Sequence, residues 1–342
     1  MGLNYLREEI GSDADKYSVV GVASSGASGP RVMILEDTTS GKHYALKYGD
    51  TRVPIPQQVK NRQILEPLFG KNHLPEIFIY GEKVMLMEAI GGQTFHESVV
   101  QSTYDFSFML GVYKKILGKF GEVWTKTAEP FSEDLPLVRQ PIPRAEKVRE
   151  AVYRRVFSGQ ALREVAENQV IVNGVETGYS LDSLLELMVD CYVAPTHTVL
   201  CHGDPNMDNV IVNSHMGWWL VDFEWVGRHD WRIPASHFVG WWLSNASSLK
   251  VTPSVEVNGA IQIDYRLGQS ELVSALLNEA WKFIEEMGNK FQEKQFERQI
   301  KLQLAVLLLG DLRFLEARNR SQYAIPLLGE GLKLLYEVAA SY

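Results

Sequence analysis

The segments LCHGDPNMDNVIV, Leu200–Val212, and WWLVDFEW, Trp218–Trp225, decide how this chain is interpreted. Each contains a short apolar run, and a polar turn separates the two runs, so together they predict two strands that follow a polar loop. Asn209 precedes the first run and Asp222 ends the second. A hairpin of this kind would return the Asp222 carboxylate toward Asn209.

Phosphoryl transfer requires a carboxylate that accepts the hydroxyl proton and oxygen ligands that hold Mg²⁺ on the phosphates. Asp204 precedes Asn209 by five positions, which is the spacing of the base and the metal-binding amide in a kinase catalytic loop. We therefore predict that Asp204 is the catalytic base and that Asn209 and Asp222 bind magnesium. His202-Gly203-Asp204 alone would fit an ordinary polar turn, and we expect His202 to support the loop structurally.

The region from Tyr17 to Glu88 alternates short β-rich runs with turns, which predicts a small antiparallel sheet. One segment with a helical spacing of apolar residues, Gln57–Leu68, lies between the third and fourth runs. The expected strands are Ser18–Val22, Arg31–Leu35, His43–Tyr48, Ile77–Tyr80 and Val84–Met87.

A glycine-rich turn between the first two runs could fold its backbone N–H groups over phosphates, with Gly26, Ser28 and Gly29 as candidates. A simple hairpin turn would need the same glycines. Lys47 closes the third run, where a kinase has the strand lysine that pairs with the α- and β-phosphates. Order along the chain favours the nucleotide interpretation for both features.

Met85–Gly92 joins the two expected lobes, and its extended backbone could bind an adenine edge at Glu88 and Ile90. Kinases normally hold the strand lysine with a helical glutamate. Glu66 is the only acid in the expected helix, near its end, and Asn61 stands where the partner is expected. Glu66 as the partner of the lysine and Glu66 as a surface carboxylate both remain open.

The pattern changes to a helical period beyond Gly91, with Phe106, Leu110, Tyr113 and Leu117 recurring every three or four residues. A chain of 342 residues with 45% hydrophobic residues is large enough for two lobes. We expect an α+β fold with a nucleotide-binding N-lobe over 1–90 and a mainly helical C-lobe over 91–342. The catalytic loop would occupy about 200–225 of the C-lobe.

These residues resemble the superfamily of aminoglycoside phosphotransferases and choline kinases, over nearly the whole chain. The resemblance implies a two-lobed protein-kinase-like fold, with ATP and Mg²⁺ as cofactors and a small-molecule hydroxyl as the acceptor. It also implies Asp204 as the catalytic aspartate, Asn209 and Asp222 as the magnesium ligands, and Lys47 as the phosphate-binding lysine.

Different segments of this chain resemble different branches of this superfamily. Ser25–Gly29 looks most like aminoglycoside phosphotransferases, whereas Asp222–Trp225 and His237–Trp241 look more like choline kinases. Choline kinases have asparagine and glutamate where this chain has Ser236 and Gly240, so choline is not established as the acceptor.

Residues just beyond Asp222 are candidate substrate contacts. Trp225 and Trp231 could stack on a sugar or surround an ammonium group, although core packing explains most tryptophans here. Glu224 and Asp230 share this turn and could bind amines. The acceptor region is expected within Phe131–Cys191 and Trp225–Leu243.

Composition excludes several classes of function. With 34 Lys and Arg against 42 Asp and Glu, the net charge is −8 and no basic stripe indicates nucleic-acid binding. Two cysteines are too few for a disulfide framework, and no run spans a bilayer, so we expect a cytoplasmic protein without a membrane partner. The oligomeric state, the acceptor and the choice between ATP and GTP stay open.

Three functions remain. The first is phosphorylation of an aminoglycoside, amino sugar or related natural product, and the second is a choline or ethanolamine kinase. The third, from another class, is a nucleotide-binding pseudokinase. A protein kinase is disfavoured because no Ala-Pro-Glu-like anchor follows Asp222.

Overall fold

The structure is a computed structural model that describes residues 2–23, 31–134, 141–157, 162–316 and 318–341. The chain divides into two compact units, Met1–Val112 with Met207–Gly227, and Tyr113–Asn206 with Arg228–Tyr342. The N-lobe expected over 1–90 lies within the first unit, which also includes 91–112 and the strand pair after Met207. The glycine-rich turn with Gly26, Ser28 and Gly29 lies outside the described residues.

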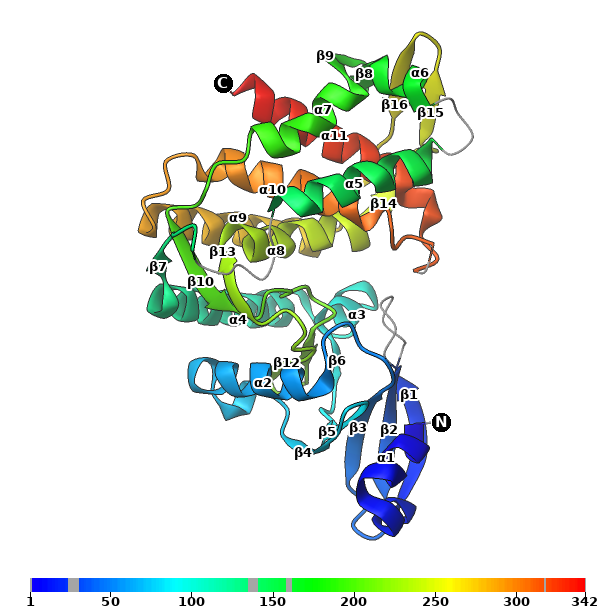
Figure 1. Cartoon of the computed structure of the whole chain (residues 1–342), viewed down its shortest axis with the longest axis vertical. Helices are drawn as coiled ribbons and strands as arrows, with labels where there is room; N and C mark the ends of the chain where they lie inside the picture. The colour runs from blue at the N-terminus through cyan, green and yellow to red at the C-terminus, as the bar shows by residue number, and fades with distance from the viewer. Residues whose placement is uncertain (1, 24–30, 135–140, 158–161, 317, 342) are drawn as a thin grey trace. The chain divides into compact units, whose positions relative to one another are not determined.

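The first unit contains a five-stranded antiparallel sheet with strand order β1-β2-β3-β5-β4 (Figure 1). Its strands occur where the sequence predicts them, within two residues at each end. They are β1 Tyr17–Ala23, β2 Arg31–Asp37, β3 His43–Tyr48, β4 Ile77–Tyr80 and β5 Val84–Glu88.

Two helices cover opposite faces of this sheet, which explains the continuous apolar run in β5. Val84 and Leu86 belong to a core cluster with Leu6 of α1, Gly2–Ile10. Met85 and Met87 pack instead with α2, Ile55–Phe69. Because successive side chains of a strand point to opposite faces, β5 is buried on both sides. The helix predicted over Gln57–Leu68 is present as α2, whereas α1 is not predicted from the sequence.

A second small sheet in the first unit has the order β12-β11-β6. Its strands are β6 Gln93–Thr94, β11 Val210–Val212 and β12 Trp218–Leu220, so the predicted hairpin is present. Gly92, with φ 147°, lies so close to β11 that a Cβ there would be 2.1 Å from the Val212 carbonyl oxygen. Only glycine permits this approach. Thr94 then caps α3, Phe95–Val100, in a capping box with Glu97.

Helices dominate the second unit, as the sequence predicts for the C-lobe (Figure 1). The helix α10 lies at its centre and contacts α5, α8, α9 and α11. Both α8 and α10 are buried around most of their circumference, which accounts for their weak amphipathic pattern. The helices are α4 Phe106–Thr127, which continues from the first unit, α5 Pro141–Val156, α6 Leu162–Glu167, α7 Leu181–Asp190, α8 Arg232–Asn245, α9 Glu271–Lys290, α10 Phe296–Asp311 and α11 Ala324–Ala340.

A four-stranded mixed sheet, which the sequence analysis missed, also belongs to the second unit. Its order is β15-β16-β8-β9, with β16 and β8 parallel. The strands are β8 Gln169–Val172, β9 Val175–Ser180, β15 Ser254–Val257 and β16 Ala260–Asp264. Asn173 and Gly174 join β8 to β9 with φ values of 49° and 77°, the left-handed pair of an Asn-Gly hairpin turn.

Short elements complete the described chain. One sheet has the order β13-β10-β7, and β14 pairs with β17. These strands are β7 Glu129–Pro130, β10 His197–Cys201, β13 Gly227–Asp230, β14 Ser248–Leu249 and β17 Leu267–Gly268. Three turns of 3₁₀ helix are Gly11–Lys16, Lys71–His73 and Ser321–Tyr323. Among the helices that the structure describes, none has the length and apolar character needed to cross a membrane.

Candidate active site

Lys47 is a buried lysine in β3, with 4% of its surface exposed. Its Nζ donates hydrogen bonds to Gln58 Oε1 at 2.9 Å, Asp222 Oδ1 at 3.0 Å and Glu224 Oε1 at 3.4 Å. A buried ammonium is costly unless it is paired, and two carboxylates supply the opposite charge here. The strand lysine is therefore part of an internal polar cluster and not a solvated surface residue.

Helix α2 contributes amides to this cluster. The Gln58 side chain is completely buried and donates its Nε2 hydrogen to the Val53 carbonyl at 2.7 Å. Asn61 donates from Nδ2 to the Phe223 carbonyl at 2.7 Å. Glu66 pairs instead with Arg62 and, at 3.6 Å, with Lys71. Glu66 is therefore not the partner of Lys47, because its carboxylate pairs with Arg62 and Lys71. The helical partner of Lys47 is Gln58.

The β11–β12 hairpin brings Asn209 and Asp222 to the same end of the strand pair. Val210 is paired with Leu220, and one step beyond this pair the Val221 N–H donates to the Asn209 carbonyl at 3.0 Å. Asp222 follows with a φ of 66°, a left-handed conformation that aspartate tolerates better than most residues. Its side chain is 37% exposed, so this carboxylate can reach both Lys47 and a ligand from solvent.

Helix α3 holds the chain just before Asn209. The backbone N–H of His96 donates to the Met207 carbonyl at 3.1 Å, and His96 Nδ1 lies 2.9 Å from Asp208 Oδ1. Together with Gly92, which brings β6 against β11, these contacts fix the approach to the hairpin. The geometry of Asn209 and Asp222 is thus built by contacts within the first unit.

Glu224 is buried beside Lys47, with 6% of its surface exposed. Burial raises the pKa of its carboxyl above the ordinary value, and the charge of Asp222 raises it further, whereas Lys47 and Arg52 act in the opposite direction. Sequence reasoning proposed Glu224 as a substrate contact and missed its ion pair with Lys47. The separation of 177 positions between the two residues leaves no local signal for this pair.

The donor set fits a magnesium ion held together with phosphates. Asp222 offers a partly exposed carboxylate and Asn209 an amide oxygen, both of the oxygen type that Mg²⁺ prefers. Within the described ranges, no group of three His, Cys, Asp or Glu side chains is placed to hold a metal ion. Such a cage is not required, because Mg²⁺ in nucleotide sites uses one or two carboxylates plus phosphates and water.

One of the backbone groups expected to contact adenine, at the end of β5, is already hydrogen-bonded within the protein. The Glu88 N–H donates to the Glu76 carbonyl at 2.8 Å, and the Glu76 N–H donates to the Glu88 carboxylate at 3.3 Å. This N–H is therefore used inside the protein. The Glu88 carbonyl and the backbone of Ile90, which is half-buried, remain the predicted contacts.

Asp204 belongs to the second unit, in the loop after β10. It follows Gly203, which has a φ of 77°, a left-handed conformation that glycine adopts without steric cost. The Asp204 Oδ1 lies 3.1 Å from Nδ1 of His237 in α8, and the two side chains are 22% and 6% exposed. His202 is completely buried, as a structural residue of this loop would be. The structure thus places Asn209 and Asp222 together in one unit and Asp204 with His237 in the other.

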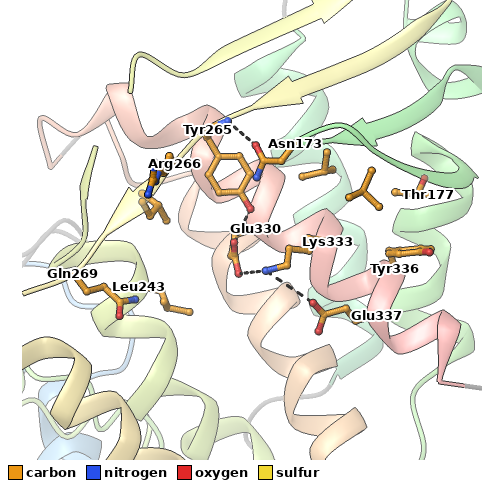
Figure 2. A pocket seen from close by; sticks show the side chains of 13 residues that line it. Asn173, Thr177, Leu243, Tyr265, Arg266, Gln269, Glu330, Lys333, Tyr336 and Glu337 are labelled. Carbon is orange, nitrogen blue, oxygen red and sulfur yellow. Dashed lines mark hydrogen bonds and ion pairs between the residues drawn. The ribbon is translucent and has the colours of Figure 1, made fainter. Parts of the chain in front are cut away.

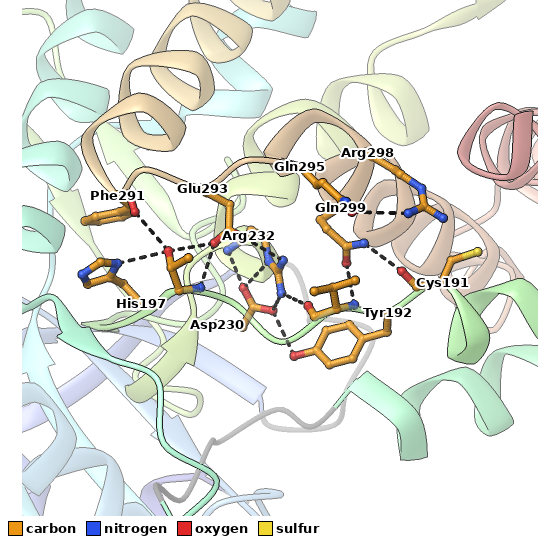
Figure 3. Close-up of polar contacts among 12 residues, drawn as sticks. Cys191, Tyr192, His197, Asp230, Arg232, Phe291, Glu293, Gln295, Arg298 and Gln299 are labelled. Atoms are coloured by element: carbon orange, nitrogen blue, oxygen red, sulfur yellow. Dashed lines mark hydrogen bonds and ion pairs between the residues drawn. The ribbon is translucent and has the colours of Figure 1, made fainter. Parts of the chain in front are cut away.

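The remaining predicted substrate contacts are buried or differently engaged. Asp230 is completely buried and binds Arg232 through both oxygens, at 2.8 Å and 2.7 Å (Figure 3). Trp231 is also completely buried, edge-on to Phe291. A substrate would not reach either side chain, so their expected role as substrate contacts is not supported. Trp225 is partly exposed and has the Arg52 guanidinium 5.3 Å from its ring centroid.

A separate pocket of about 540 Å³ lies in the second unit (Figure 2). It is lined by the β8–β9 hairpin, by Tyr265 and by the face of α11 that carries Glu330 and Lys333. Some of its polar groups contact one another: the Tyr265 hydroxyl donates to Glu330 at 2.6 Å, and Lys333 lies 3.4 Å from Glu330. Leu243 and Val172–Thr177 lie in segments expected to bind the acceptor, while Lys47, Asp204, Asn209 and Asp222 lie elsewhere.

No protein-family model matches the sequence, and a search of curated proteins gave no match. Solved structures do match. A thermostable mutant of the aminoglycoside phosphotransferase APH(4)-Ia, in ternary complex with ADP and hygromycin B, has a TM-score of 0.54 at 13% identity, covering 98% of both chains. Choline kinase LicA from Streptococcus pneumoniae has a TM-score of 0.52 at 14% identity, covering 99% of both chains.

A third similar structure is an ethanolamine kinase of Plasmodium vivax, with a TM-score of 0.51 at 14% identity. The match covers 98% of this chain and 85% of that one. Antiparallel sheet, strand lysine, hairpin and helical unit occur here in the order that the sequence predicts. The chain therefore has the protein-kinase-like fold found in aminoglycoside phosphotransferases and in choline and ethanolamine kinases.

Proposed function

We propose that this protein transfers the γ-phosphoryl group of ATP to a hydroxyl group of a small molecule, with Mg²⁺ as cofactor. The observation that carries the proposal is the buried Lys47 ammonium, 3.0 Å from the partly exposed Asp222 carboxylate, with Asn209 beside it on the same hairpin. These are the residue types that a phosphoryl-transfer site requires. The ADP complex of a protein with this fold supports a nucleotide at the site.

The residues of the first unit would bind and hold the triphosphate. Asp222 and Asn209 supply oxygen ligands, and Mg²⁺ when bound neutralises charge on the phosphate oxygens. Lys47 exchanges its contact with Asp222 for a phosphate oxygen. The backbone of Glu88 and Ile90 contacts the adenine edge.

Asp204 would act on the acceptor. Its carboxylate accepts the proton of the attacking hydroxyl while the new oxygen–phosphorus bond forms and the bond between the γ-phosphorus and the β–γ bridging oxygen breaks, which releases ADP. His237, 3.1 Å from Oδ1, orients this carboxylate and leaves its exposed side toward an acceptor. The glycine-rich turn with Gly26, Ser28 and Gly29 is our candidate cover for the phosphates.

The acceptor class that we propose is an aminoglycoside, an amino sugar or a related natural product. The net charge of −8 favours cationic acceptors. Choline and ethanolamine are the second candidate class, because kinases for these alcohols share the fold. A panel of hydroxyl compounds with labelled ATP separates the classes, since quaternary amines would compete only in the second case.

The decisive variant is Asp204→Ala. Loss of a positioned general base lowers kcat by about 10²–10⁴-fold. The matched control is Glu285→Ala, which removes an exposed carboxylate of the same unit, on α9. Turnover that survives in Asp204→Ala would remove the proposed base. Binding of Mg·ATP without turnover of any acceptor would favour the pseudokinase instead.

A further inference from the structure

The helix that faces the strand lysine offers it an amide and no carboxylate. In kinases a helical glutamate forms the ion pair with this lysine. In this chain Gln58 occupies that place, and the acid of the helix, Glu66, is paired with Arg62 and Lys71. The charge that balances Lys47 must therefore come from another element.

Position 58 is built for an amide, because both ends of the Gln58 side chain are used. Its Oε1 accepts from Lys47 and its Nε2 donates to the Val53 carbonyl at 2.7 Å. A glutamate in the same place would turn a carboxylate oxygen toward that carbonyl oxygen. Two acceptors would then face each other in a completely buried site.

The segment after β12 brings two carboxylates to Lys47, and they differ in exposure. The Asp222 side chain is 37% exposed, whereas that of Glu224 is 4% exposed. Water screens the first pair more strongly than the second. Asn61 holds the peptide between the two acids to α2 through the Phe223 carbonyl. Glu224 is thus fixed in place, and Asp222 remains accessible to a ligand.

We propose that Glu224 is the positioning residue for Lys47, taking the role that a helical glutamate has in other kinases. The inference rests on the proposed function, because it assigns Asp222 to the metal ion. When Asp222 turns to the metal ion, Glu224 is the carboxylate that still balances the buried ammonium. Without Glu224, the Lys47 Nζ would be held on the protein side by the neutral amide of Gln58 and by no carboxylate.

The first test measures the reactivity of Lys47 in the nucleotide-free, full-length protein. Acetylation by acetic anhydride is followed by mass spectrometry, with Lys60 on the exposed face of α2 as the internal reference. Glu224→Gln should raise the labelling rate of Lys47 relative to Lys60, because the Lys47 Nζ loses the buried carboxylate that holds it in place. Asp222→Asn should raise it less, although Asp222 is the nearer acid.

A rescue and a control separate positioning from general loosening of the fold. Glu224→Asp keeps a carboxylate but holds it farther from the Lys47 Nζ, so the labelling rate of Lys47 should lie between those of the unmodified protein and Glu224→Gln. Glu66→Gln, which removes the acid of α2, should leave labelling unchanged. If Glu224→Gln fails to fold, Glu224→Asp compared with the unmodified protein carries the test. A folded Glu224 variant in which Lys47 is labelled at the unmodified rate overturns the proposal.

The second test separates this role from metal binding. Titration with Mg·ATP should show weaker binding to Glu224→Gln, because the Lys47 Nζ is no longer held in place by a carboxylate, with an unchanged half-saturating Mg²⁺ concentration. A raised Mg²⁺ requirement with normal Lys47 labelling would make Glu224 a metal ligand and overturn the proposal. If the unmodified protein binds no Mg·ATP, the proposed function fails, while the labelling result still decides the role of Glu224.

Discussion

Two buried ionic clusters, one in each unit, use the same kinds of side chain and differ in their access to solvent. In the first unit Lys47 contacts Asp222 and Glu224, and the Asp222 side chain is 37% exposed. In the second unit Arg232 contacts Asp230 at 2.7 Å, and both side chains are completely buried (Figure 3). One cluster is open on one side and the other is closed.

The closed cluster ties three segments together. Arg232 donates to Asp230 and to the Val193 carbonyl, and lies 3.7 Å from Glu293. Tyr192 donates to Asp230 as well, at 3.3 Å. Such a network positions the start of α8, which carries His237. The comparison teaches that buried charge alone does not identify a ligand site. A ligand site is indicated by a partly exposed carboxylate such as Asp222, which can leave the Lys47 ammonium and bind a cation from solvent.

The largest effect should follow substitution in the open cluster, Asp222→Asn. Loss of the ligand carboxylate removes several kcal/mol of charge stabilisation in the transition state, so transfer should fall by about 10³-fold or more. The free energy of unfolding should change by less than about 1 kcal/mol, because the group is partly exposed and asparagine also tolerates a positive φ. Kinetics and urea unfolding on the same preparation measure both quantities.

A large loss of stability in Asp222→Asn would contradict the distinction between the two clusters. Loss of transfer without loss of stability would support it. The control is Glu82→Gln, which changes an exposed carboxylate of the same unit and should change neither quantity.

The closed cluster should show the opposite response. Asp230→Asn leaves a completely buried guanidinium without its nearest carboxylate, which costs about 3–5 kcal/mol of unfolding free energy. Activity per folded molecule should remain, because Asp230 is out of reach of a substrate. Urea unfolding checks the first statement and kinetics at low temperature the second. Asp190→Asn, at the exposed end of α7, is the control.

An unchanged unfolding free energy in Asp230→Asn would show that the network is not structural. Loss of activity in a fully folded variant would restore Asp230 as a substrate contact.

Sequence reasoning located the elements whose signals are local. The five strands and α2 follow from short apolar runs between turns, and the β11–β12 hairpin follows from two runs around a polar turn. Asn209 and Asp222 flank that hairpin, so strand pairing alone brings them together. The β8–β9 hairpin was missed although Asn173-Gly174 is a strong turn signal.

The rest depended on contacts between distant segments. The kinase pattern requires an acid in the helix, so it does not predict the amide of Gln58 as the partner of Lys47. The pair of Glu224 and Lys47 has no local signal, because the two residues are far apart in sequence. The sequence predicts Asp230 as a substrate contact because its type and place suit an amine. Only its burial against Arg232 reveals the structural pairing, and burial cannot be read from one local segment.

A moderate effect should follow from breaking the link between α2 and the open cluster. Asn61→Leu removes the donor to the buried Phe223 carbonyl and should cost about 1–3 kcal/mol of unfolding free energy. The Michaelis constant for ATP should rise, because Phe223 lies between Asp222 and Glu224. Gln57→Leu, which removes only a partly exposed bond to Asn61, is the control. Equal effects of both variants would show that the link to Phe223 has no special role.

The smallest effect is a change in how stability depends on pH, and it contrasts two glutamates of the first unit. Burial, and then the charge of Asp222, raise the pKa of Glu224 above 4.5. Its contribution to stability is complete below pH 4.5 and is lost as pH rises through the folded-state pKa. The stability of the unmodified protein relative to Glu224→Gln should therefore fall with rising pH.

Glu66 should give the opposite sign. Its hydrogen bond with Arg62 lowers the pKa of Glu66 below 4.5, so its contribution is present above pH 4.5 and is lost as pH falls. Relative to Glu66→Gln, the unmodified protein should gain stability as pH rises from the acid range. Urea unfolding from pH 3 to pH 8 measures both differences. Two slopes of the same sign would mean that Glu224 is not held in a buried site, because desolvation is the largest influence on Glu224, whereas the hydrogen bond with Arg62 is the largest on Glu66.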